Sequence, residues 1–204
     1  MKPLAVIVLA AGCSRRLGQN KQLVTIDGEA LIVRQCRQWL ALGLPLYCVL
    51  GYQADTIKSE LQSLPQVTVI VNNDWSEGLG GSIATATDTL NTEFEHLLFV
   101  LGDQWQLNTA SLTDFIKASQ LDLSTINVAS SSQDNTQVNV AHLSPPVIFP
   151  QRYYSALSSL QGEAGAKKVL NTYQSQISSV YLPEAFIDLD TPEQLDKFRS
   201  IYPK

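Results

Sequence analysis

A loop of small residues and cations follows the first apolar run of the chain. That run, residues 4–9, is rich in β-branched side chains and predicts a buried strand. The loop after it contains two glycines and three cations, namely Arg15, Arg16 and Lys21. Backbone N–H groups at the end of a strand can approach an anion, and cations beside them neutralise a polyphosphate. We therefore interpret the loop as a cradle for a triphosphate at the carboxyl end of the first strand, where open α/β sheets bind ligands.

Two common phosphate-binding patterns do not fit this loop. The Walker pattern places four residues between its glycines and ends in Gly-Lys-Ser/Thr, whereas Gly12 and Gly18 enclose five residues and Gln19 follows them. The dinucleotide pattern G-x-G-x-x-G fails because Ser14 stands at its second glycine. On these residues alone, an ordinary strand-to-helix turn with solvated basic side chains is the alternative interpretation.

The apolar run of residues 97–101, which is the fourth expected strand, ends in Gly102 and Asp103. A carboxylate at the tip of a buried strand, beside a triphosphate, is well placed to bind Mg²⁺, because this ion prefers hard oxygen ligands. Gln104 follows as a candidate contact to the ribose or to a second substrate. The alternative is an aspartate that only begins a turn.

A glycine-rich stretch, residues 78–81, follows the third expected strand and precedes an expected helix. Its glycines let the backbone approach a flat or anionic ligand. Ser82 lies in the first turn of that helix, where its hydroxyl group can bind a base. The stretch alone favours a flexible loop and a helix cap, and Trp75 before it is expected to pack as a structural residue.

Two later segments are candidates for binding a second substrate or a metal. Residues 162–167 form a glycine-rich turn before a helix, which can seat a monophosphate, although Glu163 can equally serve the helix dipole. Asp188 and Asp190 alternate along an extended segment and lie on one side of it. Two carboxylates on one side repel each other unless a cation or solvent intervenes. The alternative is that both aspartates cap the last helix.

Residues 9–21 resemble the signature Leu-Ala-Ala-Gly-x-Ser-x-Arg-Met-Gly-x-x-Lys of the nucleotidyltransferases related to molybdenum cofactor cytidylyltransferase, with Leu17 in place of methionine. The other segments described above also resemble that family. Trp105 stands where the family has proline after Gly-Asp-Gln, and Lys167 stands where it has arginine. Lysine lacks the planar fork with which arginine binds a phosphate through two hydrogen bonds.

The resemblance implies a role for each candidate residue and makes Asp190 the cap of the last helix. The implied roles are catalysis by Arg16 and Lys21; nucleotide binding by Leu9, Ala10, Ala11, Gly12, Ser14, Gly18, Gly81 and Ser82; metal binding by Asp103 and Asp188; and acceptor binding by Gln104, Gly162, Glu163 and Lys167.

The function that this resemblance implies is Mg²⁺-dependent transfer of CMP from CTP to molybdopterin, with release of pyrophosphate. The Leu-Ala-Ala-Gly opening is closer to the cytidylyl branch of the family than to the guanylyl branch. A molybdoenzyme or a chaperone would then receive the product. Three alternatives stay open: nucleotidyl transfer to a sugar or alcohol phosphate, a binding or delivery protein without turnover, and a nicotinamide or flavin oxidoreductase on a similar scaffold.

The elements that must position these residues alternate between strands and helices, which predicts an α/β fold. We expect a three-layer Rossmann-like nucleotidyltransferase with a mostly parallel sheet, and a single domain over residues 1–204. Its nucleotide half spans about 1–122 and its acceptor half about 123–204. Residues 124–150 break the alternation and predict a small antiparallel excursion, with strands at 138–143 and 147–149. The other strands are expected at 4–9, 46–50, 67–71, 97–101 and 177–182, and helices at about 31–40, 54–64, 80–90, 109–120, 151–158, 164–172 and 192–201.

Composition narrows the class of protein. With 204 residues, 45% hydrophobic and 16% charged, the chain suits one globular domain. A net charge of −5 argues against non-specific binding to nucleic acid, which depends on basic patches. The 3 cysteines are widely spaced and indicate reduced thiols in the cytoplasm. We expect no membrane span and no signal peptide, because no apolar run approaches about 20 residues.

Overall fold

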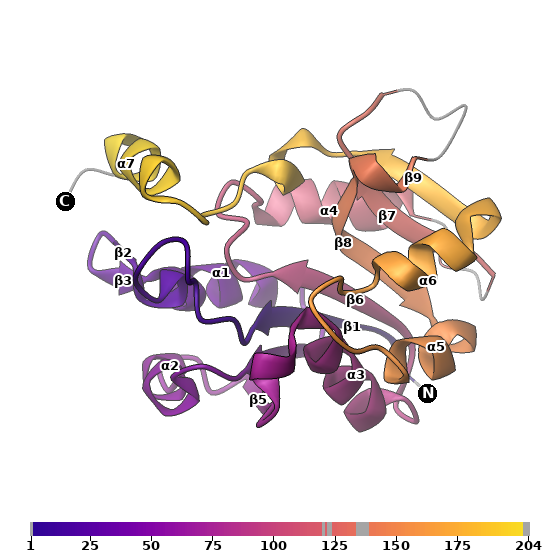
Figure 1. Ribbon diagram of the computed structural model, residues 1–204, viewed down its shortest axis with the longest axis horizontal. Helices are drawn as coiled ribbons and strands as arrows, with labels where there is room; N and C mark the ends of the chain where they lie inside the picture. The colour runs from indigo at the N-terminus through magenta and orange to yellow at the C-terminus, as the bar shows by residue number, and fades with distance from the viewer. Residues whose placement is uncertain (1, 120, 122–123, 134–138, 202–204) are drawn as a thin grey trace.

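The structure of the chain is a computed structural model that describes residues 2–119, 121, 124–133 and 139–201. It is built around a 7-stranded sheet with the order β5-β4-β1-β6-β8-β7-β9 (Figure 1). A short antiparallel hairpin, β2 (Thr25–Ile26) and β3 (Glu29–Ala30), lies outside that sheet. The sheet strands are β1 (Lys2–Ala10), β4 (Leu46–Leu50), β5 (Val67–Val71), β6 (Phe94–Leu101), β7 (Ile126–Ser130), β8 (Leu143–Pro150) and β9 (Ile177–Tyr181).

The sheet is mostly parallel, as the sequence predicts. Strand β1 pairs in parallel with β4 and with β6, and β4 pairs in parallel with β5. Strand β8 runs opposite to both of its neighbours, β6 and β7, and β9 then pairs in parallel with β7. The expected α/β fold, with a mostly parallel sheet and a small antiparallel excursion, is therefore confirmed.

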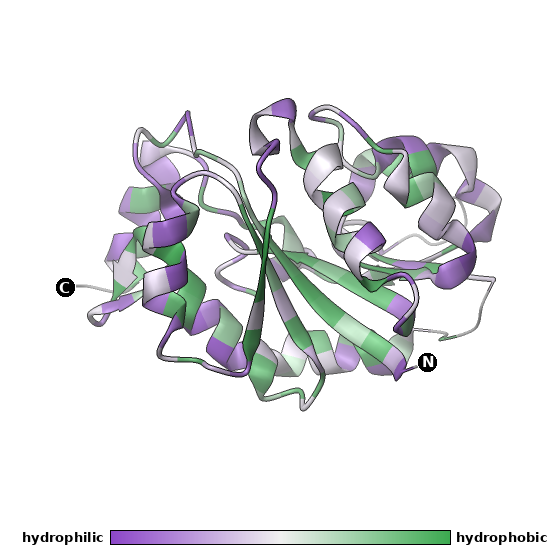
Figure 2. Cartoon of the chain, turned by 90° about the horizontal axis from the view of Figure 1, so that it is seen from below, coloured by the Kyte–Doolittle hydropathy of each residue, from purple (hydrophilic) through white to green (hydrophobic). Residues whose placement is uncertain are grey.

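Helices cover both faces of the sheet, which gives the three predicted layers. Alternate residues of β1 point to opposite faces, so Val6 and Val8 join one hydrophobic cluster while Ile7 and Leu9 join the other. The first cluster contains buried residues of α1 (Leu31–Leu40), α2 (Ala54–Leu61) and α4 (Thr109–Ala118), and the second those of α3 (Leu79–Leu90), α5 (Tyr154–Ser158) and α6 (Lys167–Thr172). Figure 2 shows the apolar strands as green ribbons between these helices.

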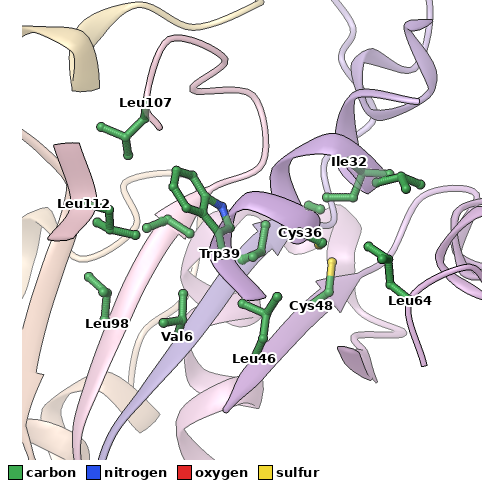
Figure 3. Packing of buried hydrophobic residues seen from close by; sticks show 14 of the residues in the cluster. Val6, Ile32, Cys36, Trp39, Leu46, Cys48, Leu64, Leu98, Leu107 and Leu112 are labelled. Carbon is green, nitrogen blue, oxygen red and sulfur yellow. The ribbon is translucent and has the colours of Figure 1, made fainter. Parts of the chain in front are cut away.

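Trp39 is the largest side chain of the first hydrophobic cluster and is fully buried. It projects from α1 toward the strands, and Val6, Leu98 and Leu112 lie around it (Figure 3). This packing fixes α1 against β1 and β6, the two strands whose ends carry the candidate chemistry.

The last helix, α7 (Pro192–Ile201), belongs to a third cluster outside the main layers. Trp105 and Phe198 pack edge to face, with ring centroids 5.2 Å apart. Leu17 of the first loop belongs to the same cluster. The aromatic residue that replaces proline at position 105 thus anchors α7 beside the loop.

The middle of the chain differs from the prediction in its strands. Strand β7 (Ile126–Ser130) was not predicted, because the polar Asn127 interrupts its apolar run although the residue is fully buried. The predicted strand at 138–143 is wrong over Val140–His142, which forms a short 3₁₀ helix, and position 138 lies outside the described residues. Strand β8 begins only at Leu143 and includes Pro145 and Pro146, next to a shift in register with β7. Proline has no backbone N–H group to donate to the hydrogen bonds of a sheet. A strand that contains prolines therefore lacks the usual sequence pattern of a strand.

Several helix boundaries also differ from the prediction: α4 ends at Ala118, and α5 begins only at Tyr154, after a short 3₁₀ helix over Gln151–Tyr153. Helix α2 ends at Leu61, three residues before the predicted end, and α6 begins only at Lys167. Residues 162–166 are therefore turns. Within the described ranges, every helix is too short or too polar to cross a lipid bilayer.

Candidate active site

A cavity of about 530 Å³ lies at the carboxyl ends of β1 and β6. Because residues 2–9 of β1 pair in parallel with β6, Leu9 and Leu101 lie side by side, and the two segments that leave these strands meet at one edge. The cavity is lined by Leu9, Ala10, Ala11, Gly12, Cys13, Ser14, Arg15, Arg16, Lys21, Gln22, Trp75, Ser76, Gly78, Leu79, Ser82, Leu101, Asp103, Glu163, Asp188 and Asp190.

The first loop is held in a defined shape by its own backbone. Ser14 has a φ of 53° and Gly18 a φ of 72°, the left-handed conformation that tight turns use. The Ser14 carbonyl accepts from the Leu17 N–H at 3.0 Å, and its hydroxyl oxygen accepts from the Lys21 N–H at 3.2 Å. Ser14 therefore fixes both the turn and the start of the segment that carries Lys21. Gly18, a predicted nucleotide contact, does not line the cavity.

Lys21 contacts two carboxylates in the cavity. Its Nζ donates to Asp190 Oδ1 at 2.7 Å and forms a second, shorter contact with Asp103 Oδ2. The side chain of Asp103 is 6% exposed and that of Lys21 is 16% exposed. Charged groups so removed from water are stable only when they are paired, so the three residues form one ionic unit.

The charges in this unit shift one another's pKa. Burial alone would lower the pKa of Lys21, but its contacts with Asp103 and Asp190 outweigh burial and raise that pKa above the ordinary 10.5. Burial raises the pKa of Asp103 above the ordinary 3.8; the Lys21 ammonium group opposes this rise, whereas Asp188 and Asp190 add to it. Lys21 is therefore positively charged at neutral pH, and the carboxylates around it still favour further positive charge.

Arg16 lies at the open side of the cavity. Its side chain is 80% exposed, and its Nη1 is 3.6 Å from Asp190 Oδ2. An exposed ion pair of this kind adds little to stability, and the guanidinium group can leave it for a stronger anion. Arg15 also lines the cavity and is exposed.

Asp190 has a different role from the one that the sequence suggested, whereas the metal-binding role of Asp188 stays a prediction. The prediction that Asp190 caps α7 is wrong, because the Thr191 hydroxyl oxygen accepts from the Gln194 N–H at 3.3 Å and is the cap. The Gln194 side chain reaches back, and its Oε1 accepts from the N–H groups of Asp190 and Thr191 at 2.7 and 2.8 Å, as in a capping box. Gln194 also donates to Asp188 at 3.1 Å. Both aspartates line the cavity, and Asp190 contacts Lys21, a contact that sequence reasoning did not predict.

Ser82 also lines the cavity, from the first turn of α3. It is 2% exposed, and its hydroxyl oxygen accepts from Asn72 Nδ2 at 3.1 Å. Asn72 in turn accepts from the Asp74 N–H at 3.0 Å, which orders the loop that precedes α3. The hydroxyl group of Ser82 is thereby oriented beside the cavity. Gly81, its predicted partner, does not line the cavity.

The candidate acceptor residues are only partly brought together. Glu163 lines the cavity, whereas Gly162 and Lys167 do not, and Lys167 is exposed. Gly162 contributes through its backbone, because its carbonyl oxygen accepts from the Gly80 N–H at 2.8 Å. This bond joins the turn that leads to α6 with the glycine-rich stretch that begins α3.

The position of Gln104 does not support the prediction that this residue contacts a substrate. It is 1% exposed and does not line the cavity. Its amide group is used by the backbone: Nε2 donates to the carbonyl oxygens of Pro145 and Ala185 at 2.6 Å each, and Oε1 accepts from the Leu101 N–H at 3.1 Å. Gln104 therefore ties the end of β6 to β8 and to the segment before α7.

Gln22 is a cavity residue that sequence reasoning did not identify. It is 2% exposed and lines the cavity, and its Oε1 has no hydrogen-bond partner within the part of the chain that the structure describes. Its position directly after Lys21 is the signal that could have found it. Among the described residues, no three His, Cys, Asp or Glu side chains already form a metal-binding group.

Comparisons with known proteins bear on this arrangement. The family model of the MobA-like NTP transferase domain matches residues 6–177. Over 193 residues the chain is 28% identical to nicotine blue oxidoreductase from Paenarthrobacter nicotinovorans, with 93% of each protein covered. It is 26% identical over 103 residues to molybdenum cofactor cytidylyltransferase from Escherichia coli, which covers 50% of this chain and 53% of that enzyme.

The fold also matches solved structures. A nucleotidyl transferase from Methanothermobacter thermautotroptrophicus superposes with a TM-score of 0.84 over 99% of this chain and 98% of that protein. The identity between the two sequences is 17%, so this likeness shows the fold alone.

Proposed function

Since the chain belongs to the MobA-like NTP transferase family and is a nucleotidyltransferase of that group, we propose that it transfers CMP from CTP to molybdopterin and releases pyrophosphate. The base and the acceptor are parts of this proposal. They are supported by the residues shared with the cytidylyl branch and by the similarity to molybdenum cofactor cytidylyltransferase over half of the chain.

One observation carries the proposal: Lys21, Arg16 and Asp103 meet in a single cavity at the ends of β1 and β6. Two cations can hold and neutralise a triphosphate, and the buried carboxylate can hold its counter-ion. These residues come from two segments far apart in the sequence, the first loop and the end of β6. A solvated turn, the alternative for the first loop, would not place the ammonium group of Lys21 against a buried aspartate.

The residues of this cavity fit a divalent cation such as Mg²⁺. Asp103, Asp188 and Asp190 offer carboxylate oxygens, and Gln22 offers a carbonyl oxygen without a partner. These are the hard ligands that Mg²⁺ prefers, and phosphate oxygens complete its shell in related chemistry. When bound, the cation supplies positive charge that offsets the charge developing on the triphosphate oxygens.

The reaction in this proposal needs no covalent intermediate on the protein. An oxygen of the acceptor phosphate attacks the α-phosphorus, a new P–O bond forms, and the bond to the leaving pyrophosphate breaks. Lys21 and Arg16 stabilise the negative charge on the transferring and leaving groups. The oriented hydroxyl group of Ser82 contacts the nucleoside, and the wall that carries Glu163 faces the acceptor. In this proposal, the positioning of the two substrates and the stabilisation of negative charge on the phosphates account for the acceleration of the reaction.

The wider setting is also proposed. We infer one domain, with residues 1–122 serving the nucleotide and residues 123–204 serving the acceptor. A molybdoenzyme or its chaperone would receive the product. We propose a cytoplasmic location, which is supported by the free thiols of Cys13, Cys36 and Cys48.

A thermal-shift screen with CTP, GTP, ATP and UTP, each with Mg²⁺, tests the nucleotide. A ligand that binds only the folded protein stabilises it, by about 2.7 kcal/mol at a hundred times its Kd. We expect CTP to raise the unfolding midpoint most, and we expect pyrophosphate release to require both CTP and molybdopterin. The absence of any nucleotide-dependent shift would refute nucleotidyl transfer. A larger shift with another nucleoside triphosphate would mean that this nucleotide, and not CTP, is the substrate.

An oxidoreductase is a second candidate, because the relative from Paenarthrobacter nicotinovorans has that name and matches over 93% of both chains. The first loop lacks the G-x-G-x-x-G pattern of nicotinamide-binding folds. The absorbance of reduced nicotinamide distinguishes the two functions. We expect it to stay constant when the protein is mixed with NADH or NADPH and candidate acceptors.

A further inference from the structure

Gln22 carries a buried oxygen atom for which the described residues provide no partner. The residue is 2% exposed, and the unpaired atom is the carbonyl oxygen Oε1 of its side chain. A buried acceptor left without a hydrogen bond costs about 1–3 kcal/mol. Native proteins keep few such groups, and those that they keep often face a ligand, an ion or a water molecule. Gln22 lines the main cavity but its Oε1 is itself closed off from solvent, so a small rotation of the amide group would bring this oxygen to a group that enters the cavity.

Gly102 makes the space in which this amide group lies. A Cβ atom at position 102 would be 2.8 Å from Gln22 Oε1 and 3.0 Å from Nε2, closer than ordinary contact allows. The Gly102 N–H donates to the Leu9 carbonyl oxygen at 3.1 Å, which fixes the tip of β6 against β1. Asp103 is the next residue. The Gln22 amide is therefore held against the backbone turn that presents the buried carboxylate.

The charges around Gln22 indicate what kind of group Oε1 can bind. This end of the cavity contains three carboxylates, those of Asp103, Asp188 and Asp190. The cations Lys21 and Arg16 both contact Asp190, and Lys21 also contacts Asp103. With Arg15 and Glu163, which also line the cavity, four carboxylates stand against three cations, so the lining retains an excess of one negative charge. A carbonyl oxygen accepts hydrogen bonds and binds cations but cannot donate to a phosphate, so a cation suits both Oε1 and its surroundings.

We propose that Gln22 Oε1 is a neutral oxygen ligand of the divalent cation that Asp103 binds, and that Gly102 is the positioning residue that admits it. Amide carbonyl oxygens are suitable ligands for Mg²⁺, Mn²⁺ and Ca²⁺. A neutral ligand beside the carboxylates holds the ion without adding negative charge near an incoming triphosphate. The assignment rests on the proposed function, because the cation in question is the one that accompanies the nucleotide.

Binding of Mn²⁺ to the nucleotide-free protein tests this assignment. The free ion is measured by electron paramagnetic resonance with wild type, Gln22→Met, Gln22→Glu and the control Gln66→Met, whose glutamine is exposed and outside the cavity. Gln22→Met should weaken Mn²⁺ binding about tenfold, a typical loss when a group that supports a metal site is removed. Gln22→Glu should bind Mn²⁺ at least as tightly as wild type, and Gln66→Met should be unchanged.

Thermal unfolding supplies a second readout. Without metal, Gln22→Met should unfold at the wild-type temperature or above, because the substitution removes an unsatisfied oxygen and keeps the volume. With Mn²⁺, its rise in midpoint should be smaller than that of wild type. Gly102→Ala should weaken Mn²⁺ binding by displacing the amide group, and the two substitutions together should weaken it no further than either alone.

Several outcomes would overturn the assignment. Wild-type Mn²⁺ affinity in Gln22→Met would do so, as would a wild-type protein that binds no Mn²⁺. A Gln22→Met protein that binds Mn²⁺ normally but loses its preference for CTP over dCTP would place a ribose hydroxyl group, not the cation, at Oε1. Failure of the proposed function is distinguishable, because it would appear as absent nucleotide shifts and absent pyrophosphate release in wild type.

Discussion

Lys21 Nζ donates to Asp190 Oδ1 at 2.7 Å, a contact between residues that lie 169 positions apart in the chain. The same ammonium group contacts Asp103 at the tip of β6. The first loop, the end of β6 and the segment before α7 are thus joined at a single positive charge. A triphosphate or a cation that enters the cavity must compete with or rearrange these contacts, so Lys21 is expected to affect both binding and turnover.

Replacing Lys21 by methionine should lower the rate of pyrophosphate release by about 10²- to 10³-fold, because preorganised charge at the reacting phosphate contributes on that scale. Asp103→Asn should also lose turnover, through weaker cation binding. Both proteins should retain the far-ultraviolet circular dichroism of wild type. Lys58→Met, at an exposed position of α2, is the matched control. Wild-type rates in both cavity variants would contradict the proposal that this cavity is the active site.

The raised pKa of Lys21 predicts a pH dependence of stability. Folded Lys21 holds its proton more tightly than the unfolded chain, in which the pKa is near 10.5. Below that pH both states are protonated and the stabilisation is complete. As the pH rises above it, the unfolded chain releases its proton first, and the stabilisation is lost as the folded pKa is passed.

The difference in unfolding free energy between wild type and Lys21→Met should therefore be constant from about pH 8 to pH 10 and shrink at higher pH. Urea titrations at three pH values measure this difference. Comparison with the variant cancels the alkaline titration of other groups. A difference that grows above pH 10.5 would mean that Lys21 is not held by its carboxylates.

The part of the site that could be predicted from the sequence lies at the ends of continuous apolar strands. Residues 4–9 and 97–101 are such strands, and their parallel pairing brings the first loop and Asp103 together. Strands of this kind are buried on both faces, so their composition alone identifies them. The parallel half of the sheet, and with it the α/β fold class, followed from the same signal.

The remainder depends on contacts that no local pattern records. Strand β7 contains the buried polar Asn127, and β8 contains two prolines, so neither reads as a continuous apolar run. Gln104 turns inward because the carbonyl oxygens of Pro145 and Ala185, from two distant segments, and the nearby Leu101 N–H bind its amide. Which residue caps α7 depends on Gln194, whose side chain completes the cap at Thr191. The Asp190 carboxylate is therefore not used as a cap and contacts Lys21.

Removing the indole group of Trp105 should destabilise the protein and loosen the first loop. The ring packs against Phe198 in the cluster that also contains Leu17, so Trp105→Ala leaves a cavity between α7 and the loop. We expect a loss of about 3–5 kcal/mol in unfolding free energy. Nucleotide-induced thermal shifts should also decrease. Tyr181→Ala, which truncates an exposed aromatic residue, should change neither, and an equal effect of both variants would argue against this coupling.

Two adjacent glycines at the start of α3 should respond differently to alanine. A Cβ atom at position 80 would lie 2.8 Å from the backbone carbonyl group of Gln161, whereas at position 81 its nearest neighbour would be 3.8 Å away. Gly80→Ala must therefore push residues 161–163 outward and strain the bond from the Gly80 N–H to the Gly162 carbonyl oxygen. We expect a loss of about 1–3 kcal/mol, as for other overpacked sites.

The same displacement should move Glu163, which lines the cavity and which we propose to serve the acceptor, so it should raise the KM for the acceptor more than that for the nucleotide. Gly81→Ala, by contrast, should unfold at or above the wild-type temperature, since alanine favours a helix by about 0.8–1.0 kcal/mol over glycine. Thermal unfolding of the two variants, with kinetics for Gly80→Ala, measures both effects. Equal stability of the two proteins would show that the backbone contact between α3 and the 161–163 turn is not tight in solution, and the turn would then be free to adapt to its acceptor.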